Sequence, residues 1–146
     1  MKKRIGLIVV GLVLALVALT GCTSSNTIPT SWFHSTSGGA VYITWTDAKG
    51  DIKGTVQEAR LPPNVPKGYK TRLTTSRLSF VGTISKGKIV LHLVEGTLKE
   101  TNHGTVSSTK LSIDNGANLI PRPGTSQQYA AALARLKKAN AARSKG

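Results

Sequence analysis

The side chains that could perform chemistry are few and widely spaced. The chain has one cysteine, Cys22, and three histidines, His34, His92 and His103. One cysteine allows neither an internal disulfide nor a cysteine-based zinc cluster, and histidines this far apart disfavour a histidine-dominated metal site. We find no nucleophile with a base and an orienting group, and no phosphate-binding loop or nucleotide fingerprint. The sequence therefore predicts no metal, no cofactor and no enzymatic activity.

Acidic residues offer the alternatives to this prediction. The two aspartates of residues 47–51 flank a glycine and could hold Ca²⁺. That stretch lacks the ligand run of a calcium loop, however, so we interpret it as a turn. An enzyme would require Glu95 or Glu100 to meet His92 or Asp114 in one cleft, because catalytic acids act in pairs or with a base.

The N-terminal region has the three parts of a secretory signal. Lys2, Lys3 and Arg4 precede residues 5–19, which carry no charge and are mostly Leu, Val and Ile. As a helix these residues would span about 22 Å, whereas a bilayer core is about 30 Å thick, so the segment is short for a stable crossing. Small residues follow it, as at a cleavage site.

The residues Leu19-Thr20-Gly21-Cys22 resemble the lipobox of bacterial lipoproteins. This resemblance implies cleavage between Gly21 and Cys22, a diacylglyceryl thioether on Cys22, and a cell-membrane anchor on the extracytoplasmic face. Two or more acyl chains hold a protein firmly to a bilayer. The alternative is an uncleaved N-terminal anchor, which would also place the following residues outside the cytoplasm.

The chain is strongly basic. Its formal charge is +14, and losing Lys2, Lys3 and Arg4 with the leader would lower it by three, to +11. Residues 123–146 contain no acid, and a Lys or Arg near an anionic membrane contributes about 1 kcal/mol. Anionic lipids or wall polymers are therefore candidate partners, although a basic surface also simply keeps a domain soluble. The candidate anionic-surface contacts are Arg135, Lys137, Lys138, Arg143 and Lys145.

From Val41 onward, hydrophobic residues recur with period two, which predicts β-strands. Turn residues separate the runs at 47–51, 85–88 and 102–104, and residues 114–116 close the last. Gly-Thr followed by a branched residue occurs four times, and glycines inside strands fit a strongly coiled sheet. We expect a mainly β fold: a small antiparallel meander barrel or sandwich of six to eight strands with one C-terminal α-helix. Its hairpin rhythm is similar to that of avidin-like and lipocalin-like barrels.

One predicted strand, residues 89–94, is apolar on both faces and should need cover on both. We expect His92 to be buried there. Two covers are available. One is the loop of residues 61–66, whose prolines bar regular structure, and the other is a helix from about Ser126 to Arg143, whose narrow apolar stripe could pack beside His92. Alternatively this basic helix lies on lipid.

Aromatic residues gather near the start of the sheet. Trp45 shares a face with Val41 and belongs to the predicted core. If exposed, the first aromatic residues could rim a pocket or contact the membrane interface. The candidate ligand or interface contacts are Trp32, Phe33, Tyr42 and His92.

These features divide the chain into a cleaved signal peptide (1–21), a lipidated cysteine with a short tether (22–31), a β-domain (32–122) and a basic helix and tail (123–146). We expect a membrane-anchored surface lipoprotein whose β-domain is a non-enzymatic binding or interaction module with an unidentified protein, lipid or polymer partner. One alternative is a nucleic-acid or anionic-polymer binding module. An extracytoplasmic location and 5% aromatic residues count against nucleic acid. Another is an envelope defence protein that excludes phage or inhibits an envelope enzyme.

Overall fold

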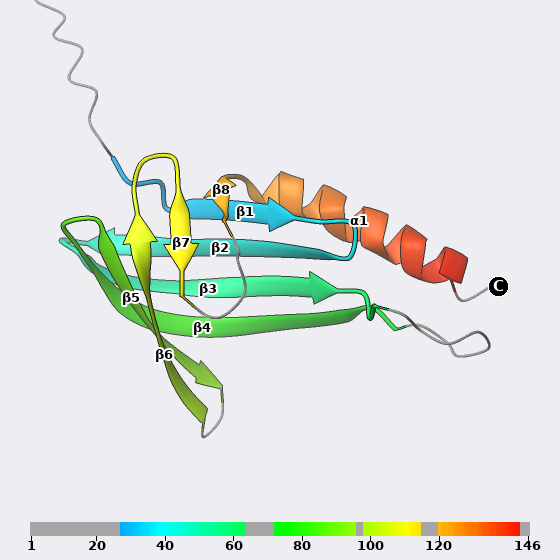
Figure 1. The fold of residues 1–146 in the computed structure, drawn as a ribbon, viewed down its shortest axis with the longest axis horizontal. Coiled ribbons are helices and arrows are strands. Elements are labelled where there is room, and N and C mark those ends of the chain that lie inside the picture. The colour runs from blue at the N-terminus through cyan, green and yellow to red at the C-terminus, as the bar shows by residue number, and fades with distance from the viewer. Residues whose placement is uncertain (1–26, 64–71, 96–97, 115–119, 144–146) are drawn as a thin grey trace, which may run out of the picture.

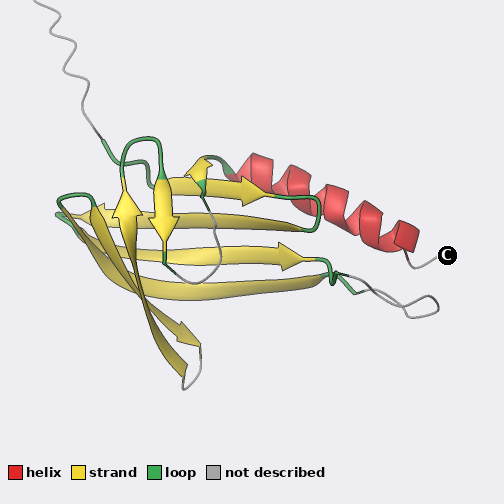
Figure 2. Ribbon diagram, viewed as in Figure 1, coloured by secondary structure: helices red, strands yellow, loops and turns green. Residues whose placement is uncertain are grey.

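The computed structural model describes residues 27–63, 72–95, 98–114 and 120–143. Eight strands and one helix follow one another along the chain (Figures 1 and 2). Among the described residues, no helix combines the length and hydrophobicity that a bilayer crossing needs. The elements are β1 (Ser31–Ser35), β2 (Gly39–Ala48), β3 (Asp51–Arg60), β4 (Thr74–Ser85), β5 (Lys88–Glu95), β6 (Leu98–Val106), β7 (Leu111–Ile113), β8 (Arg122–Pro123) and α1 (Ser126–Arg143).

The strands form one antiparallel sheet in the order β7-β6-β5-β4-β3-β2-β1-β8. Strand β8 returns to the first strand, where Trp32 pairs with Pro123. On the other edge, the Leu111 N–H of β7 donates to the carbonyl of Pro121, 3.4 Å away, just before β8 begins. The sheet is therefore a nearly closed barrel, which confirms the predicted antiparallel meander and its C-terminal helix.

Tight turns close one end of the barrel, which we call the turn end. Lys49-Gly50 and Lys86-Gly87 connect β2 to β3 and β4 to β5, and all four residues have positive φ, between 49° and 95°. Two-residue turns of this kind match the twist of the strands they join. The Ile84 N–H donates to the Gly50 carbonyl at 2.7 Å, which ties the first turn to the next strand. The opposite end, where β1, β3 and β5 end and β2, β4 and β6 begin, is the loop end.

Three of the four Gly-Thr repeats place glycine where strands approach closely. A Cβ at Gly54 would lie 2.6 Å from Phe80 Cζ and 2.8 Å from Trp45 Cβ. At Gly82 and Gly104 it would overlap a carbonyl oxygen of the neighbouring strand. Gly96, in the remaining repeat, lies outside the described residues. The repeat thus marks positions at which the curved wall of the barrel has no room for a side chain.

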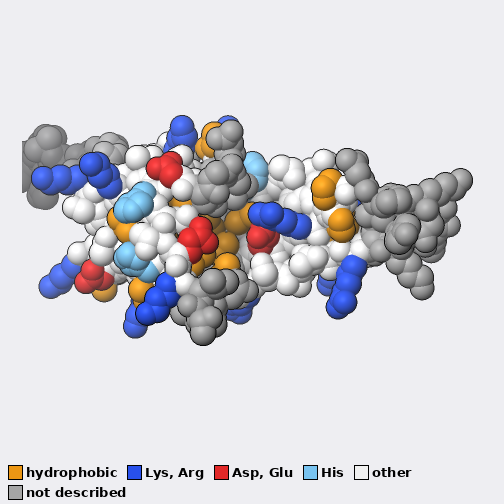
Figure 3. Space-filling view, turned by 60° about the horizontal axis from the view of Figure 1, so that its bottom comes forward, with side chains coloured by type: hydrophobic (Ala, Val, Ile, Leu, Met, Phe, Trp, Pro, Cys, Tyr) orange, Lys and Arg blue, Asp and Glu red, His pale blue; other side chains and the backbone are white. Residues whose placement is uncertain are grey.

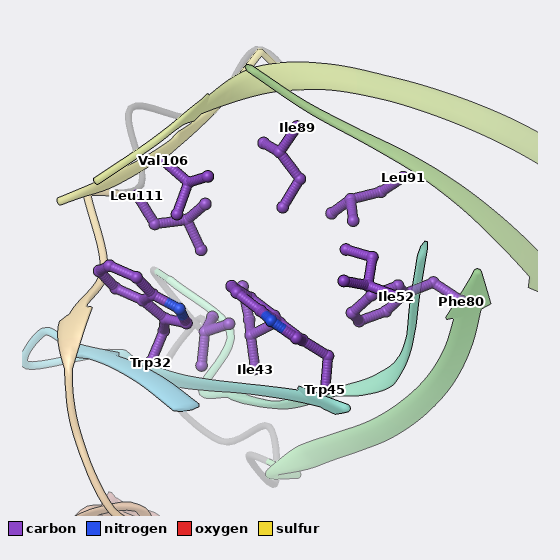
Figure 4. Packing of buried hydrophobic residues seen from close by; sticks show 10 residues of the cluster. Trp32, Ile43, Trp45, Ile52, Phe80, Ile89, Leu91, Val106 and Leu111 are labelled. Carbon is purple, nitrogen blue, oxygen red and sulfur yellow. The ribbon is translucent and has the colours of Figure 1, made fainter. Parts of the chain in front are cut away.

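The main core fills the barrel from the inside (Figure 4). Alternation along each strand sends one set of side chains inward. Trp32 of β1 and Trp45 of β2 stack there with ring centroids 6.1 Å apart, and the Trp32 Nε1 donates to the Pro29 carbonyl at 2.9 Å. The buried members are Trp32, Val41, Ile43, Trp45, Ile52, Phe80, Ile89, Leu91, Val106 and Leu111.

A second core lies outside the barrel, under α1. The helix begins as predicted, with a capping box: the Gln128 N–H donates to Thr125 Oγ1 at 3.3 Å, and Gln128 Oε1 accepts from the Thr125 N–H at 2.8 Å. Its apolar stripe packs on the outer surface of β1, β2 and β3. The buried members of this second core are Ala40, Tyr42, Ala59, Leu61, Tyr129, Ala132 and Leu136.

This position corrects two predictions about β5. We expected the helix to cover residues 89–94 beside His92, and expected His92 to be buried. Instead His92 is exposed, because the helix packs where two small residues, Ala40 and Ala59, let it approach the wall closely. The β5 strand needs apolar cover only on its inner side, where Ile89 and Leu91 point.

A third correction concerns residues 102–104, which we expected to separate two strands. They lie inside β6, where Asn102 pairs with Leu91 and Gly104 with Ile89. Asparagine and glycine are typical of turns, but here they occupy inward positions of a curved strand.

Candidate ligand-binding site

A cavity of about 160 Å³ occupies the interior of the barrel toward the loop end. Its floor adjoins the main core, since Ile43 and Leu91 belong to both. Four polar residues, Glu58, Arg60, Glu100 and Asn102, also line it. Its apolar wall includes Val41, Ile43, Val56, Leu78, Leu91 and Leu93.

Strand alternation explains why charged side chains reach this space. In β3 the inward row runs from Ile52 through Gly54 and Val56 to Glu58 and Arg60. The same phase therefore carries apolar residues near the turn end and charged residues near the loop end. In β6 the inward row likewise changes along the strand, from Val106 to Asn102 and Glu100. On the face turned forward in Figure 3, hydrophobic atoms are visible between acidic and basic side chains.

Glu58 and Arg60 form an ion pair through Oε1 and Nε. The Arg60 side chain is 66% exposed, whereas that of Glu58 is 25% exposed. An ion pair this open to water contributes little to stability, but it offsets the charge of Glu58. Burial raises the pKa of Tyr129, on the buried face of α1, and the Glu58 carboxylate raises it further.

Asn102 is the buried polar residue of the site, with 7% of its surface exposed. Within the described part of the chain, no hydrogen bond reaches its side-chain amide. An amide carries two donors and an acceptor, and the Asn102 amide opens onto the cavity, since it is not among the fully buried side-chain atoms that lack a partner. Asn102 thus supplies unused hydrogen-bonding capacity inside a mostly apolar space.

Glu100 lies two residues from Asn102 on the same inward face. It is exposed, and no ion pair to it occurs among the described residues. The cavity therefore combines an apolar body with a polar rim that contains one carboxylate paired with Arg60 and one that no described residue pairs.

The aromatic candidates do not line this cavity. Trp32 is fully buried in the main core. Phe33 and Tyr42 pack under the helix, where the Tyr42 and Tyr129 rings stack with centroids 6.0 Å apart. We predicted that Trp32 and Phe33 would rim a pocket or contact the membrane interface only if they were exposed. Trp32 is not exposed.

Of the predicted acid–base combinations, His92 and Glu100 lie on opposite faces of the sheet, and the side chain of Glu95 lies outside the described part of the structure. His92 points outward, with its Nδ1 3.0 Å from Thr101 Oγ1, while Glu100 of the neighbouring strand points inward. Asp47 Oδ1 accepts a hydrogen bond from the Gly50 N–H at 2.8 Å, which confirms the predicted turn. No group of three or more His, Cys, Asp or Glu that could hold a metal occurs in the described ranges.

Of the predicted anionic-surface contacts, the two arginines form hydrogen bonds within the protein, and the two described lysines are exposed. Arg135 donates to the Thr36 carbonyl at 2.6 Å, and Arg143 to that of Pro62 at 3.2 Å, so both hold α1 to loop-end connections. Lys137 and Lys138 are exposed. Lys145, Gly21 and Cys22 lie outside the described residues.

Sequence reasoning missed the polar lining. The signal was present in the strand phase: extending the inward row of β3 past Val56 reaches Glu58 and then Arg60. Asn102 was missed because residues 102–104 were predicted to be a turn, so the inward row of β6 was not extended through them. No protein-family model matches the chain, and no curated protein or solved structure is significantly similar to it.

Proposed function

We propose that this protein is an envelope lipoprotein, anchored through acyl chains on Cys22, whose barrel is a non-enzymatic module that binds a small molecule through its loop end. The observation that carries the proposal is the interior cavity, a mostly apolar space that the polar side chains of Asn102 and Glu100 also line. Binding sites typically combine such an apolar cavity with a few convergent polar groups.

The course of the N-terminal segment supports an orientation for the anchored barrel. The Thr30 carbonyl accepts from the Trp45 N–H at 2.9 Å, so the chain reaches β1 from the turn end (Figure 1). Cys22 precedes Thr27, the first described residue, by five residues, which span at most about 18 Å when extended. An anchor at Cys22 would hold the turn end near the bilayer and leave the loop end open to the surroundings.

Charge at the turn end is compatible with this orientation. Four exposed lysines lie there against two aspartates, Asp47 and Asp51. Each cation close to an anionic leaflet contributes about 1 kcal/mol. The cations of α1 lie farther from the anchor, because Arg135 and Arg143 contact loop-end connections. The turn-end lysines are Lys49, Lys86, Lys88 and Lys110.

The anchor is tested by replacing Cys22. We expect Cys22→Ala to abolish incorporation of labelled fatty acid and to release the protein from the membrane fraction. Ser24→Ala is the matched control and should change neither. An intact mass showing an unmodified residue 22 with the leader attached would contradict the anchor.

The binding module is tested by filling its cavity. The full chain is purified from envelope extracts in mild detergent, and small molecules released on denaturation are identified by mass spectrometry. Val56→Phe should lose the bound molecule, because Val56 lines the cavity. Val81→Phe should retain it, because Val81 is 44% exposed on the outer wall. Equal recovery from both variants would contradict binding in the barrel.

A further inference from the structure

The cavity gathers acids in a protein that has few of them. The chain contains six acidic residues, and two of these, Glu58 and Glu100, line this one space. Arg60 is the cation among the described lining residues and is paired with Glu58. The described lining therefore has a formal charge of −1, although the chain as a whole carries +14.

This arrangement disfavours an anionic ligand. A carboxylate or phosphate would need Arg60, and would have to compete with Glu58 for it. It would also lie in the same cavity as the free carboxylate of Glu100, and like charges at close range repel. Because the Arg60 side chain is 66% exposed, water would weaken any attraction that it could still offer.

The same groups suit a cation that donates hydrogen bonds. Glu100 offers carboxylate oxygens, and Asn102 offers its Oδ1 two residues away on the same face. Hydrogen bonds to charged groups are stronger than those between neutral groups. An ammonium group at the rim could keep part of its hydration while it contacts both residues.

Size limits what lies below the rim. The cavity measures about 160 Å³, and an apolar cavity of about 150 Å³ in another protein holds one benzene molecule. Branched side chains such as Val56 and Leu91 line the walls. The apolar part of the ligand is therefore restricted to a short branched or monocyclic hydrocarbon group.

We propose that the barrel binds a small primary amine, with its ammonium group between Glu100 and Asn102 and its short apolar body directed toward Leu91. This inference rests on the proposed function, since it names the ligand class of that same cavity. Glu100 acts as the selectivity residue, because its carboxylate, which no described residue pairs, is what distinguishes an ammonium from a neutral or anionic head group.

The test uses three compounds with the same branched body: isoamylamine, isoamyl alcohol and isovalerate. Binding to the full chain in mild non-ionic detergent is measured by calorimetry or by nuclear magnetic resonance titration. We expect the amine to bind about tenfold more tightly than the alcohol, as one charge-assisted hydrogen bond implies. Isovalerate should bind most weakly.

Two charge-removing variants locate the selectivity. Glu100→Gln should bring the affinities for amine and alcohol to within about twofold of each other and leave that for the alcohol unchanged. Asp51→Asn removes the same charge at the turn end and should preserve the tenfold preference. Equal losses in both variants would attribute the preference to overall charge and overturn the role of Glu100.

The outcomes separate this inference from the proposed function. If the alcohol or isovalerate binds at least as tightly as the amine, and Val56→Phe abolishes that binding, the cavity binds ligands but the amine class is wrong. If none of the three binds, the amine class is wrong, and recovery of the co-purified molecule from Val56→Phe and Val81→Phe still decides whether the cavity binds a ligand. If Val56→Phe binds all three like the unmodified chain, small-molecule binding in the cavity fails as well.

Discussion

At the turn end the barrel is filled from inside, by Trp32, Trp45, Ile52 and Phe80, whereas at the loop end its wall is covered from outside by α1. Two-residue turns hold the strands together at the first end. At the second end the helix does so, through its buried stripe and through the hydrogen bonds of Arg135 and Arg143 to loop-end carbonyls.

This difference shows how a small barrel can keep a cavity. Interiors are normally close-packed, and an unfilled core costs stability. Here the apolar contacts that the loop end lacks inside are provided outside, where Ala40, Ala59 and Leu61 pack against Leu136. The interior of the loop end can then carry polar side chains such as Asn102.

The largest expected effect in comparing the two ends comes from two leucines on the inner face of β5. Leu91 is 2% exposed, whereas Leu93 is only partly buried. Leu91→Ala should lower the free energy of unfolding by about 2–5 kcal/mol, and Leu93→Ala by about 1 kcal/mol. Urea unfolding of the full chain measures both, and equal losses would mean that the two ends are packed alike.

A second test compares two glycines. Gly54→Ala introduces a methyl group against Phe80 and Trp45 and should cost about 1–3 kcal/mol through overpacking. At Gly38, near the loop end, a Cβ would meet nothing within 4 Å, so Gly38→Ala should change stability by less than about 0.5 kcal/mol. Thermal unfolding measures both losses. A larger loss for Gly38→Ala than for Gly54→Ala would mean that the loop end is the more tightly packed one.

Asn102→Leu tests the loop end by a substitution that should increase stability, whereas the preceding substitutions should decrease it. Replacing this amide, which lines the cavity, by an apolar side chain of similar size buries more apolar surface and should raise the free energy of unfolding by about 1 kcal/mol, while ligand affinity falls. The gain should appear as a higher melting temperature. A loss of more than about 1 kcal/mol would instead assign Asn102 a structural role.

The smallest effect concerns the helix that covers the loop end. The pKa of Tyr129 is raised above 10.0 by burial and by Glu58, so the fold favours the neutral phenol. Its contribution to stability is present below about pH 10 and is lost as pH rises through the raised pKa. Tyr129→Phe should unfold with less dependence on alkaline pH, as followed by helix circular dichroism. An unchanged profile would exclude Tyr129 as the cause.

Much of this architecture could be predicted from sequence because its signals are local. Period-two alternation marks the strands, Lys-Gly pairs mark two hairpin turns, and Thr125 after Pro123 marks the start of the helix. Each of these features depends on neighbours within a few residues, so each could be identified without a three-dimensional arrangement.

The remaining features depend on distant partners. The surface that α1 covers is decided by Ala40 and Ala59, on two strands far from it in sequence. The cavity requires the inward rows of β3 and β6 to face one another, and these strands are not neighbours in the sheet. The sequence around Asn102 resembles a turn, and only pairing with β5 shows that it is a strand.

The pairing of the first strand with the last has a consequence for how the barrel forms. The Ser31 hydroxyl donates to the Gly124 carbonyl across 93 residues of sequence. A contact this distant in sequence forms late, because the entropy of closing a long loop must be lost before it forms. During synthesis, β1 lacks one of its two partners until residue 124 has emerged. The nascent chain therefore exposes an open strand edge throughout, which makes it vulnerable to aggregation and dependent on protection until closure.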